Sequence, residues 1–369
     1  MNGIEYIAKI LQQEGVEWMS CFPSNPLISA VAREGIRPIA FRHERGAVMA
    51  ADGFSRIMNR KNFGVVAVQS QAGAENALGG IAQAYADNIP ILVFLGGNSL
   101  NQLSVSPNFN AVQRYQGWCK QIEAIYEPNQ VGDVMRRAFN ALRNGAPGPV
   151  IVELIADVCD QPIPEGALNY QSPKLTRQSP EKTDIDAAAD ALISAETPLI
   201  WAGAGVLFSG ASKALTELAE LTSIPVFTTM PGKSAFDERH PLSLGSGCGT
   251  TTKMANKWLT ESDTLIALGS SLTRSPYGQS IPYGKTLIQN TVNPQDINKN
   301  ESIDIGLLGD TEITINLLVE SIKRKTKNRG FGDLTKTKLE IKKEKESWLK
   351  DWSEVLSSDA EPISYYRVI

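Results

Sequence analysis

The sequence contains few of the residues that build metal sites or disulfide frameworks. Its 369 residues include four cysteines, which form no C-x-x-C pair, and only two histidines. Three of the cysteines lie in or beside apolar segments, where free cysteine behaves as a small buried hydrophobe, so we expect neither disulfides nor a zinc site. His43 and His240 lie far apart in the chain, which also argues against a Ser-His-Asp hydrolase.

Long apolar runs and an excess of basic residues are absent as well. No run approaches the ~20 apolar residues that a membrane helix requires, and residues 1–15 lack the features of a signal peptide. The formal net charge is −4 with mixed signs, so there is no basic stripe for nucleic acid. We therefore expect a cytoplasmic protein that binds neither membranes nor nucleic acids and acts on small molecules.

Short apolar runs alternate with helical patterns between residues 17 and 154. The runs EWMSCF, RPIAF, FGVVAVQS, IPILVFLG and PVIVEL indicate strands. GVVAV and ILVFL are apolar throughout, which is typical of strands buried on both faces of a parallel sheet. The pattern predicts an α/β domain over residues 1–165, with a doubly wound, mainly parallel sheet that binds ligands beyond the carboxyl ends of its strands.

A second domain is expected after a linker. Residues 166–184 hold turn signals without apolar periodicity, and residues 185–325 again alternate strands such as PLIWAGAGV and TLIALGSS with helices. We expect helices near residues 183–194, 211–222 and 311–324. A Rossmann-like, doubly wound α/β domain follows from this pattern. Residues 326–369 are rich in lysine and predict a solvated, helical connector with Trp348 and Trp352 on one face.

Polar residues follow three of the first-domain strands. The loops are Pro23-Ser24-Asn25-Pro26, residues 42–46 around Glu44, and residues 69–76. We expect these loops to converge at the carboxyl edge of the sheet. Glu44 is expected in the first turn of a helix over residues 45–58, where the helix dipole favours a carboxylate, so a structural role is the alternative to a chemical one.

A family resemblance gives these loops a specific meaning. The string FRHERGAVMAADGFSR, with GIAQAYADNIPILVFLGG, NGAPGPVIVEL, TTMPGKSAFDERHPLSLG and TLIALGSSLTR, resembles thiamine-diphosphate (ThDP) enzymes of the acetolactate synthase and benzoylformate decarboxylase kind. The resemblance implies that residues 1–165 are the pyrimidine-binding domain. It implies that Glu44 hydrogen-bonds the pyrimidine ring of ThDP and promotes the imino tautomer that removes the thiazolium proton. The implied activity is that of a lyase or carboligase (transferase) acting on a small 2-oxo acid.

The resemblance also assigns the neighbours of Glu44. It implies that the cofactor is bound by Pro23, Gln69, Gly73 and Asn76, and that the substrate lies near Ser24, Asn25 and Gln71. Ser24 has an alternative role as the N-cap of the next helix. Gln69 stands where benzoylformate decarboxylase has a catalytic histidine, and it can orient an oxygen but not transfer protons. Gly97-Asn98-Ser99 and Ala156 depart from the acetolactate synthase pattern.

The family's diphosphate site has no counterpart in this sequence. These enzymes hold Mg²⁺ and the diphosphate with G-D-G and a downstream asparagine pair, and the nearest match, Gly309-Asp310-Thr311, is expected to be structural. No metal ligand is predicted in this chain, and Mg²⁺ would be held by a missing third domain that binds the diphosphate. The sequence ends at ISYYRVI, where that domain would begin. We expect the domain on a longer form of the chain or on a partner subunit of a homo- or hetero-oligomer.

Two alternative functions stay open. The first is a noncatalytic structural or regulatory subunit of the same fold. The second is an FAD- or nucleotide-binding protein that uses Gly203-Ala204-Gly205, although a lone G-x-G favours a structural turn. Arg274 and Thr250–Thr252 would contact the nucleotide in that case, and otherwise Arg274 would form a surface ion pair.

Overall fold

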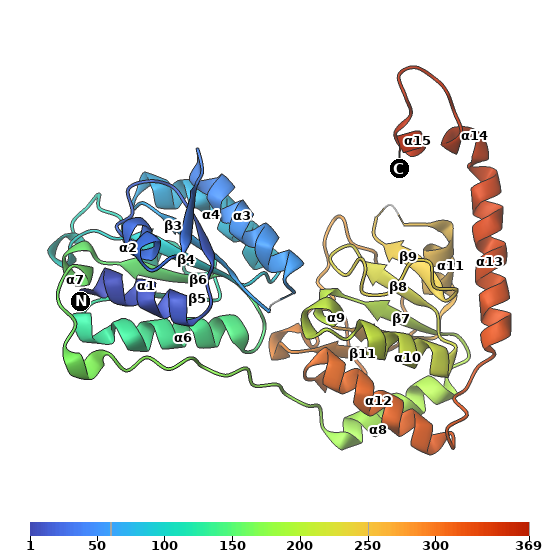
Figure 1. Ribbon diagram of the computed structural model, residues 1–369. Coiled ribbons are helices and arrows are strands. Elements are labelled where there is room, and N and C mark those ends of the chain that lie inside the picture. The colour runs from blue at the N-terminus through green and yellow to red at the C-terminus, as the bar shows by residue number, and fades with distance from the viewer. Residues whose placement is uncertain (60, 250, 369) are drawn as a thin grey trace. The chain divides into compact units, whose positions relative to one another are not determined.

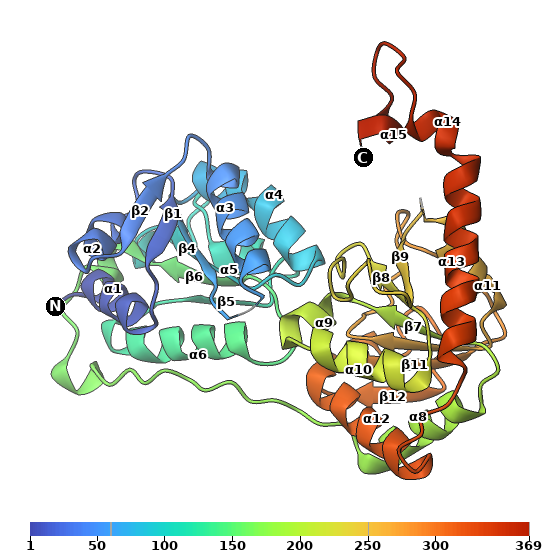
Figure 2. The ribbon, with the colours of Figure 1, turned by 45° about the vertical axis from the view of Figure 1, so that its right-hand side comes forward.

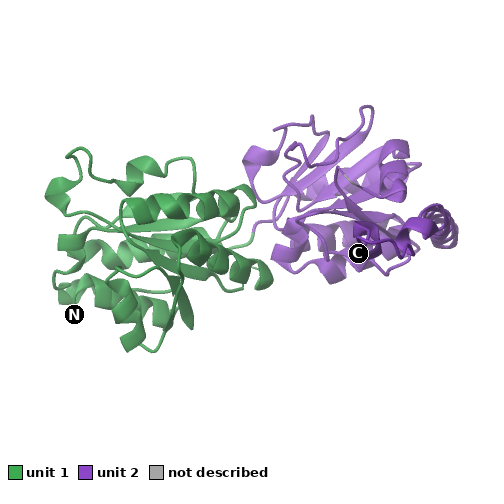
Figure 3. Cartoon of the chain, turned by 90° about the horizontal axis from the view of Figure 1, so that it is seen from above, with its two compact units in different colours: residues 1–177 green, residues 178–369 purple. Residues whose placement is uncertain are grey.

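The chain forms two compact units. The computed structural model describes residues 1–59, 61–249 and 251–368, and it divides into unit 1, Met1–Arg177, and unit 2, Gln178–Ile369 (Figure 3). Each unit has a six-stranded parallel sheet flanked by helices (Figures 1 and 2). The predicted α/β class with two doubly wound parallel sheets is confirmed. Within the described residues, no helix is long and apolar enough to cross a membrane.

Unit 1 has the strand order β2-β1-β3-β4-β6-β5. The strands are β1 Trp18–Cys21, β2 Arg37–Ala40, β3 Gly64–Val68, β4 Ile91–Gly96, β5 Gln121–Ala124 and β6 Val150–Leu154. The main helices are α1 Gly3–Gln13, α2 Leu27–Arg33, α3 Glu44–Ile57, α4 Ala72–Ala86, α5 Ala111–Arg114, α6 Val131–Arg143 and α7 Ala156–Cys159. Helices α1 and α6 pack together on one face of the sheet, and α3 and α4 pack together on the other (Figure 1).

The central strands of unit 1 explain why its sheet forms. All residues of β3 and the first five residues of β4 are buried, as their apolar runs predict. Burying one Val, Leu or Ile side chain contributes ~1.5–3 kcal/mol, so these strands supply much of the driving force for folding. The order β2-β1-β3 places three consecutive strand ends side by side. The loops that follow them carry Ser24, Glu44 and Gln69, and this order is what brings the loops together.

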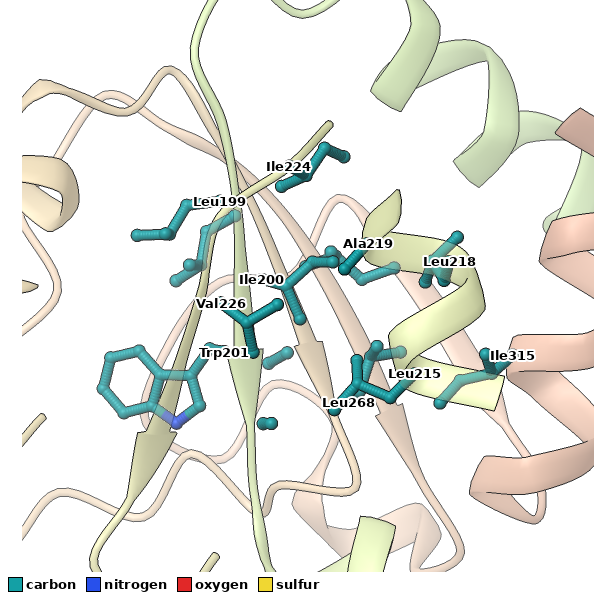
Figure 4. Close-up of a cluster of buried hydrophobic side chains, with 14 of the residues drawn as sticks. Leu199, Ile200, Trp201, Leu215, Leu218, Ala219, Ile224, Val226, Leu268 and Ile315 are labelled. Atoms are coloured by element: carbon teal, nitrogen blue, oxygen red, sulfur yellow. The ribbon is translucent and has the colours of Figure 1, made fainter. Parts of the chain in front are cut away.

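Unit 2 has the strand order β12-β11-β10-β7-β8-β9. Its strands are β7 Pro198–Ala202, β8 Val226–Thr229, β9 Ser243–Gly247, β10 Thr264–Leu268, β11 Thr286–Thr291 and β12 Ile305–Leu308. Its helices are α8 Lys182–Ser194, α9 Ala204–Ser209, α10 Ser212–Thr222, α11 Lys253–Glu261, α12 Thr311–Lys325, α13 Leu334–Asp351, α14 Ser353–Leu356 and α15 Tyr365–Val368. Figure 4 shows Leu215 and Ala219 of α10 on the side of the helix that faces Ile200 of β7 and Val226 of β8.

Three strands and several short helices were not predicted. The strands β5, β9 and β12 each lie at the edge of a sheet, and residues such as Gln121 and Glu123 in β5 interrupt the apolar pattern. An edge strand needs less apolar surface than a central one, so its pattern is weaker. The helix around Glu44 begins one residue earlier than predicted, at Glu44 itself.

The segments at either end of unit 2 have few buried residues. Residues 168–181 have no regular secondary structure, and the Tyr170 hydroxyl bonds Glu14, which ties the start of this segment to unit 1. In α13 only Ile341 is buried, and a Lys257–Glu344 ion pair of 2.8 Å joins the helix to α11. Trp348 and Trp352 lie half-buried with ring centroids 6.0 Å apart.

Candidate active site

Glu44 is a buried carboxylate at the start of α3. Only 3% of its surface is exposed, although it is the first residue of the helix and the flanking His43 and Arg45 are exposed. The helix N-terminus favours a negative charge at this position. Burial is not required for that effect, because a first-turn glutamate can point into water. The local structure therefore holds this carboxylate inside the protein rather than at its surface.

Glu44 is held by α4, the next helix along the chain. The Asn76 side-chain amide donates to Glu44 Oε2 over 3.1 Å. Gly73, one turn earlier, is close to the same carboxylate, since a Cβ added there would lie 3.1 Å from Glu44 Oε1 and 2.1 Å from Gln69 Cγ. Glycine thus lets Gln69 and Glu44 share the space above α4. Four of the predicted residues, Glu44, Gln69, Gly73 and Asn76, are brought together.

Asn25 fixes the loop after β1 to the end of β3. Its side chain is 4% exposed, its Nδ2 donates to the Val68 carbonyl over 2.9 Å, and its Oδ1 accepts the Leu27 N–H over 3.0 Å. Both the nitrogen and the oxygen of the Asn25 side-chain amide therefore bond to backbone groups. The alternative role of Ser24 as an N-cap is wrong, because α2 begins at Leu27 and Asn25 supplies the bond to its N–H. Pro23 and Ser24 lie exposed in the same loop.

Two of these loops contain residues in unfavourable backbone conformations. Ser24 has φ 88° and Gln71 has φ 52°, values that residues with a Cβ seldom adopt. Such conformations cost about 1–3 kcal/mol each and gather at binding and catalytic sites. Both residues are exposed, and they follow β1 and β3, which are neighbours in the sheet. The strain therefore lies at the same edge as Glu44.

The connection between β4 and β5 also reaches this edge of the sheet. The Tyr115 hydroxyl donates to the Ala74 carbonyl in α4, and Glu153, only 1% exposed, accepts the Ala111 N–H over 3.1 Å. Burial raises the pKa of Glu153 and also that of Tyr115. Sequence reasoning missed Tyr115 because it lies in a connection without apolar periodicity. It missed Glu153 because this is the only charged residue in the otherwise apolar strand β6.

No metal site forms in the described part of the chain. No group of three or more His, Cys, Asp or Glu side chains is placed to hold an ion there. Asp310 instead caps α12, accepting the N–H groups of Glu312 at 3.0 Å and Ile313 at 3.3 Å. This agrees with the structural role expected for Gly309-Asp310.

The glycine turn of unit 2 is filled by the chain's own backbone. A Cβ on Gly203 would lie 2.3 Å from the Gly269 oxygen, and Gly205 donates its N–H to that oxygen over 2.9 Å. These glycines allow two loops to pack closely, which supports the structural turn. Arg274 pairs with Glu301 at 2.8 Å. Thr252 caps α11, and Thr250 lies outside the described residues.

Comparison with known proteins identifies the family to which this chain belongs. Residues 1–124 match the family model of the thiamine pyrophosphate enzyme N-terminal TPP binding domain, and residues 185–318 match the central domain of the same family. Thiamine pyrophosphate is the cofactor called ThDP above. The chain belongs to the thiamine pyrophosphate enzyme family, as the resemblance indicated.

The similar proteins include an acetolactate synthase subunit and a carboligase. The chain is 34% identical over 371 residues to a probable acetolactate synthase large subunit of Methanocaldococcus jannaschii, covering 95% of this chain and 58% of the relative. It is 30% identical to glyoxylate carboligase of Escherichia coli O157:H7, covering 87% of this chain and 55% of that protein. The chain thus spans little more than half the length of these relatives.

A solved structure supports the fold independently. The crystal structure of benzoylformate decarboxylase from Polynucleobacter necessarius matches with a TM-score of 0.75 and 21% sequence identity. The match covers 86% of this chain and 61% of that one. At this identity the likeness shows a shared fold.

Proposed function

We propose that the carboxyl edge of unit 1 is the pyrimidine half of a ThDP site, with Glu44 as its catalytic carboxyl group. The observation that carries this proposal is the burial of Glu44 between α3 and α4, with Asn76 bound to one carboxylate oxygen. Membership of the thiamine pyrophosphate enzyme family supports the choice of cofactor. The relatives named above support a lyase or carboligase that acts on a 2-oxo acid.

The two oxygens of Glu44 have different surroundings. Asn76 donates to Oε2, whereas Oε1 lies above Gly73, where a side chain would crowd it. Oε1 is therefore the oxygen that we assign to the aminopyrimidine ring. In a site from which water is largely excluded, a hydrogen bond from this carboxyl group to a ring nitrogen is stronger than in water. A proton can then be held at Oε1 or passed to the ring.

The remaining residues shape the space around the ligand. Gln69 packs over Gly73 and offers an amide that can orient a carbonyl oxygen but cannot exchange protons near neutral pH. We assign Pro23 to the cofactor boundary, and Ser24 and Gln71 to the substrate side, since both are exposed at the same edge. Asn25 belongs to this side through its loop, which its buried amide holds against β3.

The chemistry supplied by ThDP when it is bound is a carbon nucleophile for the 2-oxo acid carbonyl and a sink for the electrons released on decarboxylation. We propose that Mg²⁺ and the diphosphate are held by a diphosphate-binding domain outside these 369 residues, on a partner subunit or on a further part of the same protein. The families matched here are those of the N-terminal and central domains, which is consistent with this division. We assign no role to FAD.

The proposal is tested on the native assembly. The tagged chain is purified from its own cells with every chain that accompanies it, the intact masses are measured, and ThDP with Mg²⁺ is titrated. We expect ThDP to bind and to support turnover of a 2-oxo acid, and we expect Glu44→Ala to abolish that turnover while the assembly stays folded. An assembly that binds FAD or NAD but no ThDP, or one whose turnover survives Glu44→Ala, would contradict the proposal.

A further inference from the structure

His43 immediately precedes Glu44 and caps helix α3. Its backbone is extended, with φ −154° and ψ 139°, and its Nδ1 accepts the Arg45 N–H over 3.1 Å. The bond satisfies one of the N–H groups left without a partner at a helix start. Serine, threonine, aspartate and asparagine are the usual residues here, so a histidine cap beside a buried carboxylate is an unusual choice.

The cap determines which nitrogen of His43 carries the proton. A neutral imidazole has one N–H donor and one acceptor, so an accepting Nδ1 places the proton on Nε2. Nδ1 also lies 3.9 Å from Glu44 Oε2, the oxygen bound by Asn76. A proton on Nδ1 would break the bond to Arg45 and introduce a second donor next to Oε2. Holding Nδ1 as an acceptor therefore leaves Oε2 to Asn76.

We propose that His43 is a positioning residue for Glu44. As the Nε2–H tautomer it fixes the first turn of α3, so that Asn76 keeps Glu44 Oε2 and Oε1 stays available to a ligand. The inference rests on the proposed function, because Glu44 is the group being positioned. Its structural part, the tautomer and its effect on the Glu44–Asn76 pair, can be measured on the 369-residue chain alone.

The second histidine of the chain is a matched control. His240 lies in unit 2, and its Nδ1 accepts the Leu242 N–H over 3.2 Å, while its Nε2 lies 3.2 Å from Glu220 Oε1. It has the same kind of backbone bond two residues ahead, but the residue that follows it, Pro241, carries no carboxylate. Because the chain has only two histidines, their imidazole signals are simple to separate.

The first experiment is NMR of the full chain labelled with ¹⁵N-histidine and uniformly with ¹⁵N. We expect the Nε2–H tautomer for both histidines near neutral pH, with His43 assigned by its loss in His43→Asn. We expect His43→Ala to shift the Asn76 side-chain amide resonances and to speed exchange of the Arg45 amide by about tenfold, the usual size of a lost cap. His43→Asn, whose side chain can also cap, should restore both signals, and His240→Ala should move neither.

Three results would overturn the inference. One is an Nδ1–H tautomer for His43. Another is an Asn76 side-chain signal that stays in place in His43→Ala while Arg45 exchange accelerates, because the cap would then be structural only. The third comes from the native assembly, where we expect His43→Ala to lower kcat by about tenfold with little change in KM and His43→Asn to restore it. If His43→Ala leaves kcat unchanged while Glu44→Ala is inactive, His43 does not position Glu44. If Glu44→Ala itself stays active, the proposed function is refuted instead.

Discussion

The two units have the same architecture but differ at the carboxyl edges of their sheets. In unit 1 that edge carries the buried carboxylate of Glu44 with the Asn76 amide bound to it. In unit 2 the corresponding edge is closed by backbone, where Gly203 and Gly205 pack on Gly269. A doubly wound sheet offers a ligand site at this edge, but the loops decide whether the site is open.

Replacing Glu44, the buried carboxylate of unit 1, should have the strongest effect on activity. Glu44→Ala should lower kcat of the native assembly by about 10²–10⁴, the range for loss of a proton-transferring group. Glu312→Ala replaces a first-turn glutamate of α12 in unit 2 and should leave kcat unchanged. Steady-state kinetics of the two variants provide the measurement. Equal losses would mean that the role of Glu44 is only that of a first-turn glutamate.

Glycine substitutions should separate the two edges by stability. Gly203→Ala places a Cβ 2.3 Å from a backbone oxygen that cannot move freely, so the free energy of unfolding should fall by about 1–3 kcal/mol.

Gly73→Ala also creates a clash, since its Cβ would lie 2.1 Å from Gln69 Cγ, but this side chain can rotate away and alanine gains helix propensity. The free energy of unfolding should therefore fall less than in Gly203→Ala. Turnover should nevertheless drop, because the methyl group crowds Glu44 Oε1. Urea denaturation together with kinetics tests the pair, and a reversed ranking of stabilities would contradict the difference between the edges.

Replacing Asn25 tests whether its buried side chain holds the loop after β1 in place at the carboxyl edge of unit 1. Asn25→Ala removes bonds to the Val68 carbonyl and the Leu27 N–H and leaves both groups short of a partner, so it should destabilise unit 1 by about 1–3 kcal/mol. Ser24→Gly should have the opposite sign, since glycine adopts φ 88° without strain. Urea denaturation measures both, and a stabilising Asn25→Ala would refute the anchor.

The smallest expected effect concerns pH. Burial raises the pKa of Glu153 in the folded chain above its usual 4.5, so between these two values the folded state binds more protons than the unfolded state. The free energy of unfolding should therefore fall as the pH rises through that interval. In Glu153→Gln this part of the pH dependence should disappear. Urea denaturation at a series of pH values measures it, and identical pH profiles for the two proteins would contradict the assignment.

Much of the fold follows from pattern, and the reasons for the exceptions are physical. Central strands such as β3 and β4 are apolar on both faces, so their continuous apolar runs can be recognised in the sequence. The edge strand β9, with the sequence SLGSG, pairs on one side only and needs no such run. Helix α11 was missed because it is only nine residues long, so its buried face of Met254, Ala255 and Leu259 gives a short periodic signal.

The site was less accessible to sequence reasoning than the fold. The three loops were expected to converge, but the contact of Glu44 with Gly73 and Asn76 depends on the strand order β2-β1-β3, which the sequence did not indicate. The anchoring of Asn25 could not be predicted, because a loop amide looks the same whether it faces a substrate or a carbonyl. His43 carried a weak local signal, a polar residue just ahead of a helix, which is where an N-cap belongs.

The role of Glu44 can be seen in a structure of the native assembly with ThDP and Mg²⁺ bound. We expect a Glu44 carboxylate oxygen within about 2.6–3.2 Å of a pyrimidine ring nitrogen, the range of a functional hydrogen bond. We also expect Asn76 to donate still to the other oxygen. A pyrimidine ring bound at unit 2, or one bound at unit 1 out of reach of Glu44, would show that Glu44 does not have this role.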